Sequence, residues 1–407
     1  MNAKQFSGFL VGICATAGAS AASTCSPGTY DPAGGSACIP APVGTYIQIF
    51  GATASTPAPA GSFVNVTGAT VATFAPVGYY VATSGATAPT AAGTGNYTAG
   101  TGATAPIGGG MLASAMNMAT SGVHELLGSQ QAMGDAGKSG FDISVQSGRT
   151  RLGQAGLGAS ANQAVGATSL VVQHRSGTAL ADWRVFGGFA NQQLKTITAG
   201  SGDGRTWLLG IGRGLGGAPD APVGFNAYAG QTRSDIVRTV TELSTAETHK
   251  HSASVTLAGL SLSGGLPLPA LAAQLRVEGG VNYFQQGAVT ETAITSGTTA
   301  RLQLAQASFW TLPAFVGLEH TLPGVRIQWG WRGDLNPRRE ITASLASGGT
   351  YNFSIPIQGS AANAAVVRVR FSSLQLGQGL TLDGGAQFEA GPKLRQQQAQ
   401  LVLSKRW

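Results

Sequence analysis

Charge and long apolar runs are both scarce in this chain. Only 10% of its 407 residues are charged, whereas a soluble globular protein carries about a quarter. Beyond the N-terminus, no stretch approaches the ~20 continuous apolar residues that a membrane helix needs. Any membrane span must therefore be built from strands. Basic residues exceed acidic ones by 24 to 17, but they are scattered singly, so nucleic acid is not expected as a partner.

The N-terminus has the three parts of a signal peptide. Lys4 supplies the positive charge, residues 6–18 are apolar, and the small residues 19–21 form a cleavage site. We therefore predict a signal peptide over residues 1–21, which implies export from the cytoplasm.

Cysteine is rare, with three in the whole chain. Cys14 would leave with the signal peptide, so Cys25 and Cys38 remain in an oxidising compartment, where a disulfide is expected. Metal ligation by this pair is the weaker alternative. The residues before Cys25 lack the apolar residue of a lipobox, so lipidation is not expected.

Residue patterns for catalysis are sparse. Gly134–Ser139 is similar to a phosphate-binding loop, but Ala132 stands at the required first glycine and no apolar strand precedes it. His249 and His251 have strand spacing without a third ligand, and we interpret them as part of an exposed loop. The N-terminal repeats described next contain one acidic residue, Asp31, and no histidine, which excludes a catalytic triad there. We predict no enzymatic activity, no cofactor and no metal site.

Glycine is abundant, with 61 residues, and much of it belongs to a repeat of 17 residues over positions 25–107. Aromatic residues mark the repeat, at Tyr30, Tyr46, Phe63, Tyr80 and Tyr97. A Gly-Ala-Thr triplet recurs in step at 51, 68, 85 and 102. Such units are stable only when stacked on one another. A stacked solenoid and a solvated low-complexity stalk both remain open for residues 22–109.

Residues 110–131 carry a helical stripe with spacings of four and three, at Leu112, Met116, Ala119, Val123 and Leu126. The pattern predicts one amphipathic helix within a linker over residues 110–135.

From about Phe141 onwards, apolar and polar residues alternate with the period of a strand. The apolar rows include Trp329, Trp331 and Phe353. If these rows face lipid, the polar rows face a wet lumen. The predicted lumen residues are Arg276, Glu278, Asn282, Arg326, Gln328, Arg332, Arg368, Arg370, Asp383, Gln387 and Glu389. A soluble β-sandwich would alternate in the same way and is the alternative.

The predicted fold class is all-β, with a C-terminal transmembrane antiparallel barrel over residues 136–407. Twelve strands are expected near 181–196, 203–215, 222–240, 249–263, 272–292, 301–321, 324–332, 338–345, 350–358, 363–376, 379–390 and 396–407. A further pair at 141–148 and 167–175 would raise the number to fourteen. Compact turns at 323–324, 347–349 and 377–379 would then lie on the periplasmic side.

The order of signal peptide, repeats, helix and terminal barrel resembles an autotransporter of type V secretion. The resemblance rests on the last strands and on the terminal Trp407, with Leu401 and Leu403 on the same face as an assembly signal. One departure is Lys405, which stands where these proteins usually have an apolar residue.

The resemblance implies an outer-membrane anchor that exports its own N-terminal repeats as a passenger and displays them on the cell surface for adhesion. The implied partners are outer-membrane lipid, the barrel-assembly machinery and a host or cell-surface ligand. Asn117 is the only asparagine in the helix, which therefore has no Asn-Asn pair. For this reason we expect that the passenger is not cut off and stays attached to the barrel. The alternative functions are a porin-like channel with a periplasmic N-terminal segment and a secreted all-β adhesion protein without a membrane span.

Overall fold

The computed structural model describes most of the chain between residues 25 and 407. Its description leaves out residues 1–24, 35–36, 132–138, 153–162, 177–181, 197–199, 217–222, 244, 296–298, 337–338, 347–350, 358–362 and 393. The predicted signal peptide, most of the segment similar to a phosphate-binding loop and the predicted turn at 347–349 lie outside the described residues.

The chain forms two compact units. The first holds residues up to Pro76 together with 80–90 and 102–104. The second holds Val77–Tyr79, 91–101 and everything from Ala105 to Trp407.

The repeats fold as short antiparallel hairpins, one for each period of 17 residues. The strand pairs are β1 (Thr29–Tyr30) with β2 (Ile39–Pro40), β3 (Thr45–Tyr46) with β4 (Thr56–Pro57), β5 (Ser62–Phe63) with β6 (Thr73–Phe74), β7 (Tyr79–Tyr80) with β8 (Thr90–Ala91), and β9 (Asn96–Tyr97) with β10 (Ile107–Gly108). Each hairpin is far too short to be stable by itself.

Within the first unit, a regular series of backbone hydrogen bonds joins each hairpin to the next. The Gly28 N–H donates to the Ile47 carbonyl at 2.9 Å, and the Gly44 N–H donates to the Val64 carbonyl at 2.8 Å. Gly44 has φ of +82°, and a Cβ on it would lie 2.4 Å from the Gly85 carbonyl oxygen. The glycine of the repeat is therefore required both by its backbone conformation and by the close approach of a neighbouring hairpin. The repeats are stacked here.

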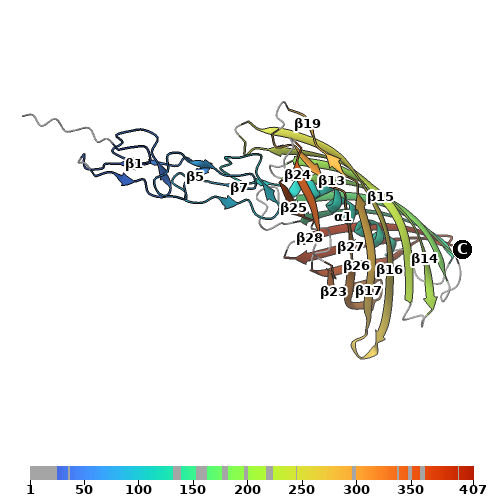
Figure 1. The fold of residues 1–407 in the computed structure, drawn as a ribbon. Coiled ribbons are helices and arrows are strands. Elements are labelled where there is room, and N and C mark those ends of the chain that lie inside the picture. Colours follow the sequence, from blue (N-terminus) through green and yellow to red (C-terminus); the bar gives the residue numbers. More distant parts are fainter. Residues whose placement is uncertain are drawn as a thin grey trace, which may run out of the picture. The chain divides into compact units, whose positions relative to one another are not determined.

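Twelve strands of the second unit close into an antiparallel barrel (Figure 1). They are β11 (Gly140–Leu152), β12 (Gln163–Ser176), β13 (Trp183–Lys195), β14 (Gly200–Gly216), β15 (Val223–Val240), β16 (Glu247–Leu268), β17 (Ala273–Gln286), β22 (Pro313–Leu322), β23 (Val325–Asp334), β26 (Ala364–Gly377), β27 (Leu380–Gly391) and β28 (Leu394–Arg406). The first barrel strand, β11, pairs with the last, β28, from Gly140↔Arg406 to Leu152↔Leu394. The predicted all-β class and the twelve-stranded barrel are confirmed.

The predicted strands differ from the observed ones in several places. The predicted single strand 301–321 is divided into Leu302–Leu304, Ala307–Thr311 and Pro313–Leu322, and the first of these lies outside the barrel. The segments 141–148 and 167–175, left uncertain from the sequence, lie in the barrel strands β11 and β12. The segments 338–345 and 350–358 do not belong to the barrel. They form β24 (Glu340–Leu345) and β25 (Asn352–Pro356) of a separate sheet with β18 (Val289–Thr290) and β20 (Leu302–Leu304). This four-stranded sheet, named here the cap sheet, also alternates in polarity because one of its faces is buried.

Two short strands complete the barrel region. β21 (Ala307–Thr311) pairs with the last residues of β17. β22 begins two residues after β21 ends and pairs with the preceding part of β17. β19 (Thr292–Ala293) pairs with β16 near His249.

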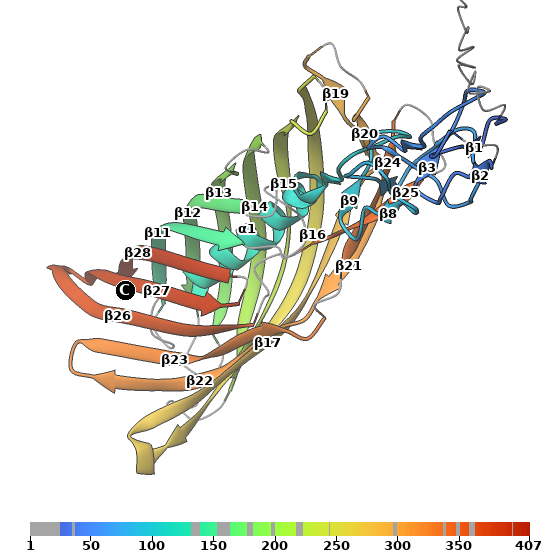
Figure 2. The same cartoon turned by 90° about the vertical axis from the view of Figure 1, so that its left-hand side faces the viewer.

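A helix lies inside the ring of strands (Figure 2). The one-turn η1 (Gly110–Ala113) leads into α1 (Ser114–Gln131), in agreement with the predicted range. The helix is not amphipathic in its surroundings, because the residues of its first three turns are almost all buried, polar ones included. Its apolar stripe packs into the main core, while Met118 on another side contacts a second cluster with Val165 and Leu194. Among the described residues, no helix is both long and apolar enough to cross a membrane.

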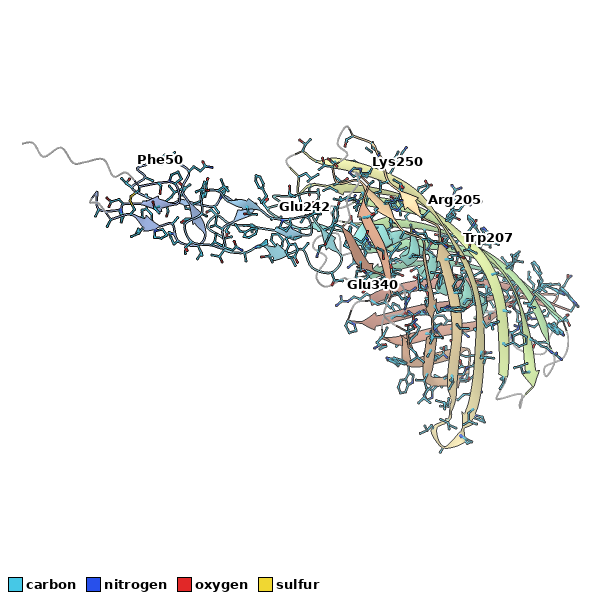
Figure 3. The ribbon with its side chains drawn as sticks, viewed as in Figure 1. Phe50, Arg205, Trp207, Glu242, Lys250 and Glu340 are labelled. Atoms are coloured by element: carbon cyan, nitrogen blue, oxygen red, sulfur yellow. A yellow bond between two sulfur atoms is a disulfide. The ribbon has the colours of Figure 1, made fainter. Side chains whose placement is uncertain are left out.

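The outer face of the barrel carries rows of exposed apolar residues. Trp207 projects outward from β14 (Figure 3) and is 44% exposed. The other tryptophans, Trp183, Trp310, Trp329, Trp331 and Trp407, are exposed as well. Exposed aromatic and aliphatic rows on a closed barrel, opposite a polar interior, are the arrangement of a membrane barrel rather than of a soluble sandwich.

Candidate functional site: the helix-filled lumen and the cap sheet

The start of α1 is held by strand side chains at one end of the barrel. The Gln163 amide, at the start of β12, donates to the Gly110 carbonyl at 3.0 Å and accepts a hydrogen bond from Asn117 at 3.2 Å. The Gln192 amide of β13 donates to the Met118 carbonyl at 2.9 Å. These amides are fully buried and fix the position of the helix along the lumen.

Small residues let the helix approach the wall closely. A Cβ on Gly122 of α1 would lie 2.4 Å from the Thr206 hydroxyl oxygen of β14. Similarly, a Cβ on Gly188 of β13 would lie 2.8 Å from a methyl carbon of Leu126. Helix and wall are therefore in direct contact, with no room for a side chain between them at these points.

A buried ionic group joins α1 to the opposite wall. The Glu389 carboxylate of β27 accepts a hydrogen bond from Arg332 of β23 at 2.5 Å, and lies 3.3 Å from Nε2 of His124 on the helix. It also accepts one from Gln387 at 2.7 Å. The paired charges offset part of each other's desolvation cost. Three elements far apart in sequence meet at this carboxylate.

A second lumen group is centred on Arg368 of β26. Its guanidinium donates to Gln387 at 2.8 Å and to Gln328 of β23 at 3.0 Å, and it lies 3.4 Å from the Glu278 carboxylate of β17. This group links strands across the interior of the barrel.

The remaining predicted lumen residues also lie on inner faces, although they do not form one cluster. Arg276 contacts Gln274 at 3.3 Å, and the Asn282 amide donates to Thr311 at 2.9 Å. The last three, Arg326, Arg370 and Asp383, stand at inward positions of their strands. Arg326 lies opposite Arg370 in the register of β23 and β26. Asp383 lies on β27 two residues before Gly385, which pairs with Arg370. No described residue of the predicted lumen set lies among the exposed apolar residues of the outer face.

The predicted disulfide pair and the C-terminal residues are placed as follows. A disulfide joins Cys25 and Cys38 in the first repeat, with their Cα atoms 5.5 Å apart. Leu401 and Leu403 point outward from β28, and the exposed Trp407 stacks near His174 with ring centroids 6.1 Å apart. The Lys405 ammonium donates to the Gln378 carbonyl in the neighbouring turn, so its charge stays near the barrel rim.

The interpretation of the two histidines as part of an exposed loop is wrong. His249 and His251 lie on the inner face of β16 and are buried, because β16 extends further than the sequence indicated. Nε2 of His249 lies 2.9 Å from the Glu247 carboxylate, and His251 lies 3.8 Å from Glu291. The described His, Cys, Asp and Glu residues form no group arranged for a metal ion.

Arg238 of β15 organises the end of the barrel that carries the cap sheet. Its guanidinium donates to both carboxylate oxygens of Glu291, at 2.9 and 2.5 Å, and to the Ala300 carbonyl at 2.8 Å. It also donates to the Tyr97 hydroxyl at 2.7 Å, which brings the last repeat into the same network. Arg238 is 1% exposed, so the network is sealed from solvent.

Two groups of this network outside the barrel strands have shifted pKa values. Burial raises the pKa of Tyr97 to about 12, against the opposing effect of the nearby Arg238 charge. Burial alone would also raise the pKa of Glu291, but the hydrogen bonds and charge of Arg238 outweigh it and lower that pKa to about 2. Both side chains therefore keep the protonation state that the network requires over a wide pH range.

The residues that seat the helix and those that form the network at the cap were not predicted from the sequence. The polar inner row of β28, which includes Gln398, could have been found by the same alternation that revealed Leu401 and Leu403. The Gln398 amide donates to the Glu125 carboxylate of α1 at 2.7 Å. In contrast, no local pattern distinguishes Arg238 or Glu291.

The two ends of the barrel differ in their connections. At the end that carries Gly140 and Arg406, neighbouring strands are joined by tight links, such as η3 (Pro269–Leu271), 323–324 and 378–379. At the opposite end lie the four strands of the cap sheet, β18, β20, β24 and β25. Figure 1 shows the labels of β24 and β25 at the end of the barrel away from the C-terminus.

The comparisons with known proteins concern the fold. No protein-family model matches the chain, and no curated protein matches it in sequence. Among solved structures, it is similar to the translocator domain of the autotransporter NalP from Neisseria meningitidis. The identity is 17% and the TM-score 0.56, over 72% of this chain and 98% of that one.

Two further structures align less closely. The transport unit of the autotransporter AIDA-I from Escherichia coli is 13% identical with a TM-score of 0.46, over 73% of this chain and 98% of that one. The β domain of the Bordetella autotransporter Brka is 12% identical with a TM-score of 0.41, over 66% and 100%. Together with the NalP alignment, the twelve-stranded barrel and its inner helix show the fold of an autotransporter translocator domain.

Proposed function

We propose that the protein is an outer-membrane translocator that exports its own N-terminal repeats, residues 22–109, and keeps them attached at the cell surface. The course of the chain through the barrel supports this proposal. η1 and α1 enter beside Gln163, at the end with the cap sheet, and the next described strand begins at Gly140, at the opposite end. The repeats are thus joined to the barrel through its own lumen.

The orientation in the membrane follows from the connections. Membrane barrels have short periplasmic turns and longer extracellular loops. The tight turn at 323–324 and the chain end at Trp407 would then face the periplasm, and the cap sheet would face outward. The apolar outer rows would contact outer-membrane lipid, and the exposed Leu401, Leu403 and Trp407 would be available to the barrel-assembly machinery.

A porin-like channel is the alternative. Its lumen would have to stay open, whereas here Gln163, Gln192 and Glu389 hold α1 within it. This arrangement favours a barrel that is filled once the repeats have passed.

Adhesion is the role we propose for the displayed repeats. Their surface is almost free of charge, with Asp31 as the one charged residue between positions 25 and 108. Phe50 and Phe74 are 75% and 68% exposed. Neutral surfaces with exposed aromatic side chains are suited to contact with another molecule.

An epitope inserted near Gly51 tests the export. Intact cells of a Gram-negative host should bind the antibody and lose the tag to added protease, while the barrel stays in the outer membrane. The matched control is the same tag inserted at Pro323-Gly324, which should be inaccessible until the outer membrane is opened. If the tag near Gly51 is protected in intact cells with a folded barrel, self-export is wrong and the channel hypothesis takes its place.

A further inference from the structure

The last repeat has no following repeat in the sequence, yet its stacking positions are filled. In the first unit, the glycine N–H at the start of each hairpin donates to a carbonyl about 20 residues later, as in Gly44 to Val64 and Gly61 to Val81. The equivalent glycine of the last hairpin is Gly95. Its N–H donates to the Ser354 carbonyl of β25 at 2.9 Å.

In the aromatic packing, too, β25 takes the position of a following repeat. The Tyr97 ring of the last repeat stacks on Phe353 of β25, with centroids 4.9 Å apart and planes 15° apart. In the first unit, a glycine carbonyl of a later repeat approaches Gly44 and Gly61. At Gly78 the Tyr351 ring takes this place, and a Cβ on Gly78 would lie 2.3 Å from the ring. Tyr351 and Phe353 are themselves stacked, at 6.1 Å.

We propose that the hairpin β24–β25 takes the place of a sixth repeat and is the docking surface that caps the C-terminal end of the repeats. A stack of repeats needs a terminal cap because each repeat is stable only through its neighbours. The first repeat has the Cys25–Cys38 disulfide, and the last has β25. The partner that this surface fits is a 17-residue repeat of the same chain.

The cap is made of barrel loops, so the last repeat gains its stacking partner only at the cap-sheet end of the barrel. This consequence rests on the proposed function where it concerns the outer surface of the cell. The docking itself holds whether or not the barrel exports the repeats.

Hydrogen exchange of the full chain in detergent tests the docking. In the variants Phe353→Ala and Tyr351→Ala, amides of residues 91–108 should exchange at least about tenfold faster than in the parent protein, because an aromatic ring packed against the last repeats is lost. The barrel should remain folded in these variants, as shown by a shift of its band in gel electrophoresis when the sample is heated. The matched control Phe50→Ala, an exposed aromatic of the first unit, should leave exchange in 91–108 unchanged.

A second variant, in which residues 340–357 are replaced by a short Gly-Ser linker, removes the whole hairpin. The proposal is overturned if residues 91–108 keep their protection in this variant and in Phe353→Ala while the barrel remains folded. A barrel that fails to fold in the linker variant leaves the decision to the two point variants. Failure of surface exposure near Gly51, with the exchange result intact, would contradict the export and not the docking.

Discussion

The Tyr97 hydroxyl accepts a hydrogen bond from Arg238, with the oxygen 2.7 Å from Nη1, although the two residues are 141 positions apart in the chain. Arg238 belongs to the barrel wall and Tyr97 to the last repeat. The contact therefore couples the repeat to the barrel through a charge that is also bound by Glu291.

Removal of Arg238 should be strongly destabilising at the cap. The variant Arg238→Met leaves the Glu291 carboxylate buried without its partner, which costs about 3–5 kcal/mol. Adding Glu291→Leu should restore much of the loss, because the uncompensated charge is gone. Exchange at the Ala305 amide, which donates to the Thr342 carbonyl at 2.9 Å and not to Glu291, reports the change in both variants. The control Arg205→Met, on the exposed outer row of β14, should have little effect. Equal protection in Arg238→Met and the parent would refute the role of the pair.

Acid should release the same region. The pKa of Glu291 in the folded protein is about 2, below its ordinary value of 4.5. The stabilisation is therefore complete above about pH 4.5 and is lost as the pH falls toward 2. Cleavage of the segment 287–306 by pepsin should rise across this window in the parent protein. The double variant Arg238→Met/Glu291→Leu should lack the step, and a step of the same size in it would rule out Glu291 as the cause.

At high pH, Tyr97 sets the limit. Its folded pKa of about 12 lies above the ordinary value of 10, so its contribution is fully present below about pH 10 and is lost as the pH rises through 12. Ultraviolet titration of tyrosinate should show one equivalent near pH 12 that is missing from Tyr97→Phe. A parent protein whose tyrosines all titrate near pH 10 would contradict the burial of this hydroxyl.

Two helical glycines should respond in opposite ways to the same substitution. Gly122→Ala places a methyl group against Thr206 and should cost about 1–3 kcal/mol through overpacking. Gly128→Ala meets open space and should stabilise the helix by up to about 1 kcal/mol through its better helix propensity. Thermal unfolding in detergent and single-channel conductance measure the seating of α1. Higher conductance is expected for Gly122→Ala alone, and identical behaviour of the two variants would show that the helix does not pack on β14.

Much of the fold could be predicted because a barrel strand has a lipid side and a water side. This contrast identified β17, β23, β26, β27 and β28. The predicted number of twelve agrees with the barrel, although it included β24 and β25 in place of β11 and β12. The same contrast led to the wrong assignment of β24 and β25, since Phe353 and Ile355 are buried by the last repeat and its neighbours rather than by lipid. Alternation shows that a strand has one apolar face, but it does not show what covers that face.

The disulfide should stabilise the first repeat locally. Cys25 and Cys38 are 13 residues apart, and closing a loop of this size contributes about 3 kcal/mol. In the paired variant Cys25→Ser/Cys38→Ser, amides between Gly28 and Ile47 should lose protection, while residues 91–108, capped by β25, should keep theirs. Uniform exchange in the paired variant and the parent would mean that stacking alone holds the first repeat.

The site was less predictable than the fold for a physical reason. The inward direction of Arg332 and Glu389 follows from strand period alone, so both could be named. Their contact with His124 depends on which side of the helix faces which strand, and that is set by tertiary packing. Arg238, Glu291 and Tyr97 each stand alone in the sequence, and they become a group only when β15, a long loop and a repeat meet.

The pairing of β11 with β28 closes the barrel through the last strand of the chain. Until residues 394–406 are in place, the sheet has two free edges, and unpaired backbone amides are not tolerated in hydrocarbon. A chain broken off even one strand early would have no stable place in the bilayer. The pairing between Gly140 and Arg406 at one end and Leu152 and Leu394 at the other therefore decides whether the barrel has any free edge.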